Sequence, residues 1–372
     1  MSVNFGKIYT MGVFGKSGSA QSKIGYRDLV DIVSKKVRSP KLYRSDIISP
    51  LQVTMNIRPK LSDEEAVFFF KPSVLAGSSN VEAALKLGFG AIAENNWEIL
   101  SVSAFSGHYL KDTGTIVRHY GMINKIASEG ISAVTTEGKD KFYKLFGVSV
   151  DKKDEKGDPI VYGAFHLMKK FNMSTSQLTE QYYKKPDFKI AAGTYVGTID
   201  INGKSVYVLN GFNPGQIEDY TKPKDRIVIL HIRKGQKGTP LKKMREDVIG
   251  PTNPAKGKGI RNILYTHKAK FGVKTVNMNW NGFHFSAGNI EAAAELFNFF
   301  NVPLENAFIG KLLKEHASYS NDEIRMLTEN PLVKWKEAIK PVFDHTELLP
   351  SRTVIEFART IKGQLQVYLI GP

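Results

Sequence analysis

The stretch from Asn281 to Phe300, NGFHFSAGNIEAAAELFNFF, constrains the fold of this chain more than any other segment. Ser286 and Gly288 mark a turn from a strand into an Ala-rich helix, because small and polar residues precede a run with helical spacing. Glu295 falls inside that helix, and its carboxylate is expected to point back over the helix start. We therefore predict a strand, a turn and a helix that bring Glu295 to His284.

A histidine in this position is a candidate nucleophile if its ring is held in one orientation. A nucleophilic imidazole needs one ring nitrogen for the substrate and an acceptor on the other nitrogen, which sets the tautomer and the ring direction. Glu295 is the candidate acceptor for His284, and Ser286 stands close to both. A histidine near an apolar run is more often a packing or surface residue, so the pair by itself leaves both interpretations open.

Upstream residues favour the functional interpretation, because they form a set that suits phosphate. The segment GPTNPAKGKGIRNI carries Thr252 and Arg261 on a glycine-rich loop, and Arg245 stands just before it. Guanidinium groups bridge phosphate oxygens with two hydrogen bonds, and small residues let the backbone approach. Farther upstream, the strand pattern AVFFFK ends at Lys71, since the following proline stops the strand and leaves the ammonium at its edge.

Taken together, these residues resemble one family, the nucleoside diphosphate kinases. Its members carry Lys-Pro-Asp at a strand end, an Arg before Gly-x-Thr-Asn-Pro, an Ile-Arg-Gly, and Asn-x-x-His-Gly-Ser-Asp followed by a helix with a Glu. The matching residues of this chain are Lys71-Pro72, Arg245, Gly250 to Pro254, Ile260-Arg261, Asn281, His284, Ser286 and Glu295. The resemblance is strongest over residues 244–300 and weaker over 64–122, and it is that of a divergent member with a large insertion and two terminal extensions.

The resemblance implies an activity and a role for each matching residue. In the family, a histidine takes the terminal phosphate of a nucleoside triphosphate, becomes phosphohistidine and passes the phosphoryl group to a nucleoside diphosphate. By resemblance, His284 is the nucleophile, and Glu295 and Ser286 orient its ring. The nucleotide-binding residues implied in the same way are Lys71, Tyr120, Arg245, Thr252, Arg261 and Asn281.

The chain departs from the family at several positions of this set. The family's His-Gly-Ser-Asp is His-Phe-Ser-Ala here, with Phe285 and Ala287, and Lys-Pro-Asp has become Lys-Pro-Ser with Ser73. The spacing from Arg245 to Thr252 is one residue longer than usual. Magnesium in these enzymes rides mainly on the nucleotide phosphates, so the resemblance implies Mg²⁺ as a cofactor and no metal site made by the protein alone.

The order of the expected elements indicates an α+β protein. By resemblance, residues 61–300 form a nucleoside diphosphate kinase-like domain with a ferredoxin-like βαββαβ antiparallel sheet backed by helices. Residues from about 123 to 225 form an insertion, in which alternation on both sides of Asn202-Gly203 predicts a β-hairpin.

The remaining residues form an N-terminal extension, 1–60, and a helical C-terminal extension, 301–372. The elements expected in them are helices over 26–37, 304–316 and 330–343 and strands over 51–59 and 365–370.

The charge balance and the cysteine content of the chain indicate which binding partners and which cellular compartment to expect. Lys and Arg number 52 against 36 Asp and Glu, and the resulting net charge of +16 suits anionic substrates or nucleic acid. Most lysines are mixed with acidic residues. The cleaner basic segments are SKKVRSPKLYR, residues 34–44, and the loop with Lys256, Lys258 and Arg261, and only this loop belongs to the candidate site. The chain has no cysteine and no apolar run near the roughly 20 residues that span a bilayer, so we expect a cytoplasmic protein without a membrane partner.

Two classes of function remain open. The first is an active phosphotransferase of the nucleoside diphosphate kinase type, which binds nucleoside tri- and diphosphates and forms a homo-oligomer as its relatives do. The second is a catalytically altered structural protein on the same fold that binds nucleotide or nucleic acid. The retained histidine, glutamate and arginines favour the first class, whereas the insertion and the basic charge favour the second.

Overall fold

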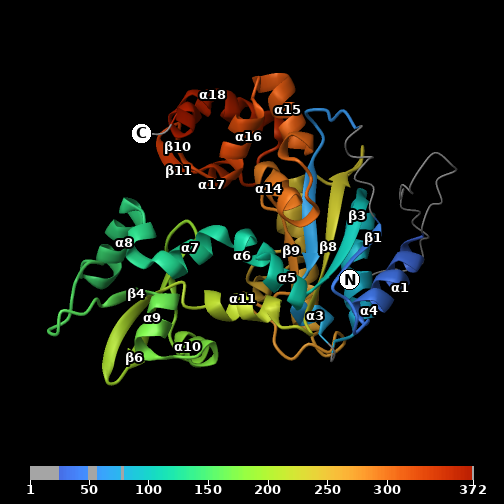
Figure 1. The fold of residues 1–372 in the computed structure, drawn as a ribbon. Coiled ribbons are helices and arrows are strands. Elements are labelled where there is room, and N and C mark those ends of the chain that lie inside the picture. Colours follow the sequence, from blue (N-terminus) through green and yellow to red (C-terminus); the bar gives the residue numbers. More distant parts are fainter. Residues whose placement is uncertain (1–24, 49–56, 77–78, 371–372) are drawn as a thin grey trace. The chain divides into compact units, whose positions relative to one another are not determined.

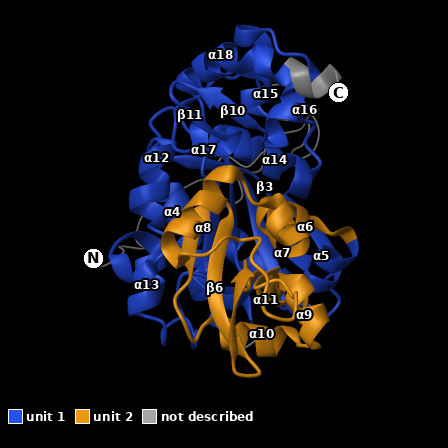
Figure 2. Ribbon diagram, turned by 90° about the vertical axis from the view of Figure 1, so that its left-hand side faces the viewer, with its two compact units in different colours: residues 1–112, 223–372 blue, residues 113–222 orange. Residues whose placement is uncertain are grey.

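The structure divides the chain into two compact units, which are coloured separately in Figure 2. It is a computed structural model that describes residues 25–48, 57–76 and 79–370. Unit 1 comprises residues 1–112 and 223–372, and unit 2 comprises residues 113–222, nearly the stretch expected as an insertion. Helices and antiparallel strands occur in both units, so the predicted α+β class is confirmed.

Unit 1 contains a five-stranded sheet in the order β1-β3-β8-β2-β9, in which every neighbouring pair is antiparallel (Figure 1). The strands are β1 (Arg44–Ile48), β2 (Glu65–Phe70), β3 (Trp97–Ser106), β8 (Arg226–Lys234) and β9 (Phe283–Phe285). All six residues of β2 are buried, as are nearly all residues of β3 and β8. Their continuous apolar runs, in place of strict alternation, follow from cover on both faces.

Helices cover this sheet, and the alternation of side chains along β2 separates the apolar core from the candidate site. The longer helices of the sheet region are α1 (Tyr26–Val37), α4 (Val81–Glu94), α13 (Gly259–Thr266) and α14 (Asn289–Phe300). Phe68 and Phe70 belong to one buried cluster with residues of α1 and α4. Phe69 points to the opposite face, where the ring of Phe299 in α14 lies 6.0 Å from its own ring.

Short elements complete this part of unit 1. The short helices are α3 (Pro72–Leu75), α5 (Gly107–Thr113) and α12 (Leu241–Lys243). A π-helix covers Met244–Ile249, and 3-10 helices cover Pro254–Lys256 and Leu304–Asn306.

The C-terminal extension differs from the expectation in two places. The helix predicted over 330–343 is wrong, because these residues form a hairpin of β10 (Leu332–Trp335) and β11 (Ala338–Pro341). The strand predicted over 365–370 is also wrong, because these residues continue helix α18 (Ser351–Ile370). A tertiary contact stabilises the hairpin: the side-chain amide of Gln364 in α18 bonds both the N–H and the carbonyl of Lys334, at 2.8 Å each, and so satisfies the edge of β10.

The other elements of the two extensions are closer to the expectation. The helix predicted over 26–37 is confirmed as α1, and the helix predicted over 304–316 is a 3-10 turn followed by α15. The strand expected over 51–59 lies mostly outside the described residues. The remaining helices of the C-terminal extension are α15 (Phe308–Ala317), α16 (Asn321–Thr328) and α17 (Val342–Thr346). Within the described ranges, every helix is too short or too polar to span a bilayer.

Unit 2 has a sheet of its own, in the order β4-β7-β6-β5. The predicted hairpin is confirmed: Asn202 and Gly203 have φ of 51° and 79°, and they join β6 to β7 in the left-handed conformation that a two-residue turn needs. Its strands are β4 (Val161–Gly163), β5 (Phe188–Ala191), β6 (Thr194–Ile201) and β7 (Lys204–Leu209). Its helices are α6 (Thr115–His119), α7 (Gly121–Glu129), α8 (Thr136–Phe146), α9 (Ala164–Phe171), α10 (Thr175–Tyr182), α11 (Asn213–Thr221) and a 3-10 helix over Gly130–Ala133.

Candidate functional site

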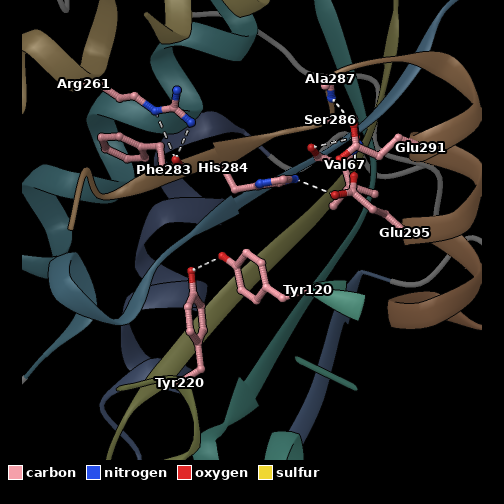
Figure 3. Close-up of polar contacts among 10 residues, drawn as sticks. All are labelled: Val67, Tyr120, Tyr220, Arg261, Phe283, His284, Ser286, Ala287, Glu291 and Glu295. Atoms are coloured by element: carbon pink, nitrogen blue, oxygen red, sulfur yellow. Dashed lines mark hydrogen bonds and ion pairs between the residues drawn. The ribbon is translucent and has the colours of Figure 1, made fainter. Parts of the chain in front are cut away.

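His284 lies in β9, and its ring is held by one carboxylate. Backbone pairing places His284 opposite Phe69 of β2, and the two rings stack with centroids 4.3 Å apart and an interplanar angle of 16°. The Nε2 atom of His284 lies 2.6 Å from Oε1 of Glu295 in α14 (Figure 3). The contact predicted from the sequence is therefore present, because the turn after β9 brings the first helical turns of α14 back over the strand.

Ser286 completes a chain of hydrogen bonds behind the histidine. Its Oγ donates to Oε2 of Glu295 at 2.5 Å and accepts the backbone N–H of Val67 at 2.8 Å. Glu295 is only 4% exposed, and its two oxygens accept from His284 and Ser286 respectively. A carboxylate that accepts two such bonds is stabilised in its ionised form, so Nε2 of His284 is the ring nitrogen that carries a proton.

The surroundings of His284 favour its neutral form. Burial lowers the pKa of His284 well below the ordinary value, and the positive charges of Arg245, Lys71 and Arg261 lower it further. The carboxylate of Glu295 acts in the opposite direction, since it stabilises a protonated ring. The side chain of His284 is only 17% exposed, and its burial together with the three positive charges outweighs the effect of Glu295. The imidazole is therefore neutral at physiological pH.

Lys71 is the first of the three cations, and it directly follows β2. Its backbone N–H donates to the carbonyl of Gly282 at 2.9 Å, and its Nζ lies 3.4 Å from the carbonyl oxygen of Asn279. Burial lowers the pKa of Lys71 to about 7, and the charges of Arg261 and Arg245 contribute to the shift. The ammonium expected at the strand edge is thus poised near half protonation at neutral pH, and a nearby anion would restore its charge.

Arg245 lies in the π-helix Met244–Ile249. A π-helix holds more residues per turn than an α-helix, so one additional residue is accommodated without shifting the flanking chain. Thr252 follows this π-helix by three residues. Among the described residues, the buried Nε of Arg245 has no hydrogen-bond partner.

Arg261 is buried at the start of α13, and the structure gives it a role in holding the backbone. Its NH1 group donates to the carbonyl of Gly250 at 2.8 Å, and its Nε and NH2 groups donate to the carbonyl of Phe283 at 3.2 and 2.8 Å (Figure 3). These bonds fasten the GPTNP loop to β9. Arg261 is only 3% exposed. Its positive charge nevertheless lies near enough to His284 and Lys71 to lower the pKa values of both.

The side chain of Asn281 contacts Thr252 at its backbone carbonyl. The Nδ2 group of Asn281 donates to the carbonyl of Thr252 at 3.1 Å and to that of Met278 at 3.0 Å. The Oδ1 atom of Asn281 is buried, and no described residue donates a hydrogen bond to it. Thr252 itself is exposed, so this residue contributes a main-chain carbonyl to the arrangement and presents its side chain to solvent.

Tyr120 belongs to unit 2, in which it follows α6. Its hydroxyl lies 3.1 Å from the hydroxyl of Tyr220 in α11, and the two rings are 5.8 Å apart (Figure 3). Its expected place behind the histidine stays a prediction. The structure thus joins His284, Glu295 and Ser286 directly, and it gathers Lys71, Arg245 and Arg261 around them electrostatically.

Glu291 is a residue of this region that the sequence argument did not single out. Its Oε2 accepts the backbone N–H of Ala287 at 2.8 Å, which caps the start of α14. Burial and the charge of Glu295 raise the pKa of Glu291 to about 8, so it is largely protonated at neutral pH. The sequence could have indicated its place beside Glu295, because residues four apart on a helix are neighbours.

These carboxylates decide how a magnesium ion could be held. Glu295 is engaged by His284 and Ser286, and Glu291 is capped by Ala287 and largely protonated. Magnesium prefers ionised oxygen ligands in octahedral geometry. The two glutamates of α14 therefore do not fit a resident magnesium ion.

Comparisons of the chain with protein-family models, with curated proteins and with solved structures gave no match. The resemblance to the nucleoside diphosphate kinases therefore rests on the sequence motifs alone.

Proposed function

We propose that this chain is a nucleoside diphosphate kinase-like phosphotransferase that works through a phosphohistidine at His284. The observation that carries the proposal is the pair of hydrogen bonds from Ser286 and His284 to the two oxygens of Glu295, 2.5 and 2.6 Å long. A carboxylate that accepts from Nε2 selects the tautomer with the lone pair on Nδ1. Burial and three cations favour the neutral ring, which is the nucleophilic form.

Two buried polar atoms support a nucleotide as the ligand. The Nε–H of Arg245 is a charged donor that suits a phosphate oxygen, and Oδ1 of Asn281 is an acceptor that suits a sugar hydroxyl. A buried polar group without a partner costs about 1–3 kcal/mol, so a ligand that satisfies both would recover that free energy on binding. Lys71, with its lowered pKa, would regain its full charge beside the same phosphates.

The proposed reaction has two balanced steps. The lone pair on Nδ1 of His284 attacks the terminal phosphorus of a nucleoside triphosphate, and the P–O bond to the diphosphate breaks with its electron pair on the leaving oxygen. The proton on Nε2 stays hydrogen-bonded to Glu295, whose negative charge balances the phosphorylated ring. In the second step, a terminal oxygen of a nucleoside diphosphate attacks phosphorus and the P–N bond breaks. Magnesium is part of the nucleotide substrate in both steps.

The order of elements supports the same proposal, because β2, α4, β3, β8, α13 and β9 follow one another along the chain as a ferredoxin-like βαββαβ unit requires. We infer that this arrangement tolerates two departures from the family. Phe285 replaces the family's glycine, but it faces the core and its ring lies 5.7 Å from that of Trp97. The additional residue between Arg245 and Thr252 is taken up by the π-helix.

Transfer of label from γ-³²P-labelled ATP tests the proposal. We expect acid-labile, base-stable label on the protein, its loss in His284→Ala, and its chase to GTP when GDP is added. His267 is exposed at the end of α13, so His267→Ala is a matched control that should keep the label. Equal labelling of His284→Ala and the parent protein would refute the proposal.

One observation favours the second class of function, a nucleotide-binding structural protein. Arg261, a clamp residue by resemblance, donates to the backbone carbonyls of Gly250 and Phe283, as a purely structural arginine would. If this alternative holds, ADP and ATP bind with similar affinity in calorimetry while no label reaches His284. Binding without label would therefore select the structural role, and binding with label the enzymatic one.

A further inference from the structure

Positive charge is concentrated at the N-terminal end of the chain, away from the residues of the proposed site. Residues 1–44 contain nine Lys and Arg residues against two Asp residues, and so contribute +7 of the net charge of +16. This stretch is about an eighth of the chain's length. A concentration of this kind marks a polyanion-binding surface more strongly than the same charge spread evenly.

The described part of this stretch presents its cations on one continuous piece of backbone. Lys35 and Lys36 lie in the last turn of α1, and Arg38 and Lys41 lie in the turn that leads to β1. All four are exposed. Buried apolar residues alternate with them, because Val37 and Leu42 belong to the core cluster. Val37 and Leu42 therefore hold the segment against the core, while its charged side chains are exposed to solvent.

Aromatic rings are exposed beside these cations. Tyr43 is 47% exposed, and its ring meets the ring of Tyr109 edge to face at 5.2 Å and that of His108 at 5.7 Å. The side chain of His108 is 61% exposed. The backbone carbonyl of Tyr43 accepts the N–H of Ser106 at 2.9 Å, which fixes Tyr43 to β3. A rigid aromatic ring that faces solvent beside cations suits stacking with a planar ligand group.

Arg44 stiffens this aromatic group. Its guanidinium lies 5.7 Å from the ring centroids of both Phe105 and Tyr109, and its NH1 group donates to the hydroxyl of Tyr109 at 3.2 Å. Such contacts hold the ring positions, and Tyr43 remains 47% exposed. The rings are thus preorganised, which reduces the entropy lost when a ligand stacks on them.

Acidic residues near the rings are already paired. Asp112 accepts the hydroxyl of Tyr43 at 3.1 Å and forms an ion pair with His108 at 2.8 Å. Asp46 accepts from Ser103 at 2.7 Å and pairs with Arg44 at 3.4 Å. A third carboxylate, Glu82, interacts with Arg38 and is paired with Lys86. The five cations of this region outnumber these three carboxylates, so the surface keeps a positive charge; they are Lys35, Lys36, Arg38, Lys41 and Lys111.

We propose that these residues form a binding surface for single-stranded nucleic acid, distinct from the nucleotide site proposed around His284. We name it the Tyr43 surface, defined by Lys35, Lys36, Arg38, Lys41, Tyr43, His108 and Lys111. The cations would contact successive phosphates, and unpaired bases would stack on the rings of Tyr43 and His108. A single strand is favoured over a duplex because the bases of a duplex are already stacked and do not offer their faces.

Fluorescence anisotropy with a labelled oligothymidylate of about 20 nucleotides tests the proposal. If the five cations each neutralise one phosphate, the slope of log K against log salt is about −3.5, and Lys35→Ala with Lys36→Ala reduces it by about 1.4. Tyr43→Ala should weaken binding about fivefold to about 150-fold, which corresponds to the loss of one stacked base. Tyr43→Phe keeps the ring and should bind within about twofold of the parent protein.

A matched pair of lysines controls for net charge. Lys152 and Lys153 are exposed in an acid-rich segment of unit 2, and their replacement by alanine removes the same charge. This control should change the affinity far less than the Lys35 and Lys36 variant. An unchanged affinity in excess MgADP would support a site separate from His284. Equal losses in the two lysine variants, equal binding of duplex, or displacement by polyglutamate of equal charge would each overturn the proposal.

Discussion

The rings of Phe69 and His284 stack 4.3 Å apart and almost parallel, on the face of the sheet opposite to the apolar cluster of Phe68 and Phe70. The stack restricts the tilt of the imidazole, and the bond to Glu295 restricts its rotation. Two neighbouring antiparallel strands therefore position the candidate nucleophile before any ligand is bound. A fixed ring orientation of this kind is what a nucleophilic imidazole requires.

Glu295→Gln should separate orientation from binding. Glutamine keeps the shape of the side chain but loses the charge that favours a proton on Nε2 of His284. We expect phosphoryl transfer to slow on the order of 10- to 100-fold, as with other orienting partners of imidazole, while nucleotide affinity changes little. Stopped-flow labelling and calorimetry measure the two quantities. If neither changes, the carboxylate does not orient the ring.

Arg261→Ala should act mainly on stability, in contrast to Arg245→Ala. Loss of the Arg261 guanidinium leaves the carbonyls of Gly250 and Phe283 without their donor, which we expect to cost about 1–3 kcal/mol of unfolding free energy. Arg245→Ala removes a group with an unpartnered Nε and should leave stability within about 0.5 kcal/mol, while it weakens nucleotide binding. Urea unfolding of both variants checks this contrast. Equal destabilisation of the two variants would contradict it.

Lys71 should take up protons when a nucleotide binds. Its pKa of about 7 means that the free protein carries a partly neutral Lys71 at neutral pH, and polyphosphate favours the charged form. Affinity should therefore fall as pH rises above 7, by up to tenfold for each unit while the lysine is neutral in the free protein. Calorimetry in buffers of different ionisation enthalpy counts the protons. Lys71→Arg keeps a permanent charge and should show no uptake, so equal uptake in this variant would reject Lys71 as the source.

Glu291 should make stability fall as pH rises. Its pKa is about 8 in the folded chain and 4.5 as an ordinary carboxyl, so between these values the folded state holds a proton that the unfolded state has released. Unfolding free energy is consequently highest below pH 4.5 for this group and decreases up to pH 8. Glu291→Gln mimics the protonated form, keeps an acceptor for Ala287 and removes the decrease, a gain of about 4 kcal/mol at pH 8. Unfolding curves from pH 5 to 8 would show no such gain if Glu291 is ionised throughout.

Some elements could be predicted from local sequence patterns, because burial or backbone conformation restricts which residue types occur in them. The apolar run of β2, the helix α1 and the turn at Asn202-Gly203 were predicted because burial and backbone conformation select residues at those positions directly. The bond between His284 and Glu295 was also predictable, since one turn and one helix separate them.

Longer-range contacts decided the rest. Residues 330–343 have an apolar spacing compatible with a helix or a hairpin, and the amide of Gln364 in α18 stabilises the hairpin from outside the segment. The role of Arg261 in binding backbone carbonyls was equally hidden, because the carbonyls of Gly250 and Phe283 cannot be read from residue types. Nor does a sequence reveal that the Nε of Arg245 and the Oδ1 of Asn281 are buried without partners.

The sequence by itself determined the α+β class, the strand-turn-helix that joins His284 to Glu295, and the concentration of positive charge before β1. Each depends on residues close together in the chain. Only the tertiary structure decided which face of β2 carries the histidine, how the cations shift the pKa values of His284 and Lys71, and which polar atoms remain unsatisfied. Those properties arise from burial and from charges that lie far apart in sequence, and both exist only once the sheet and its helices have packed.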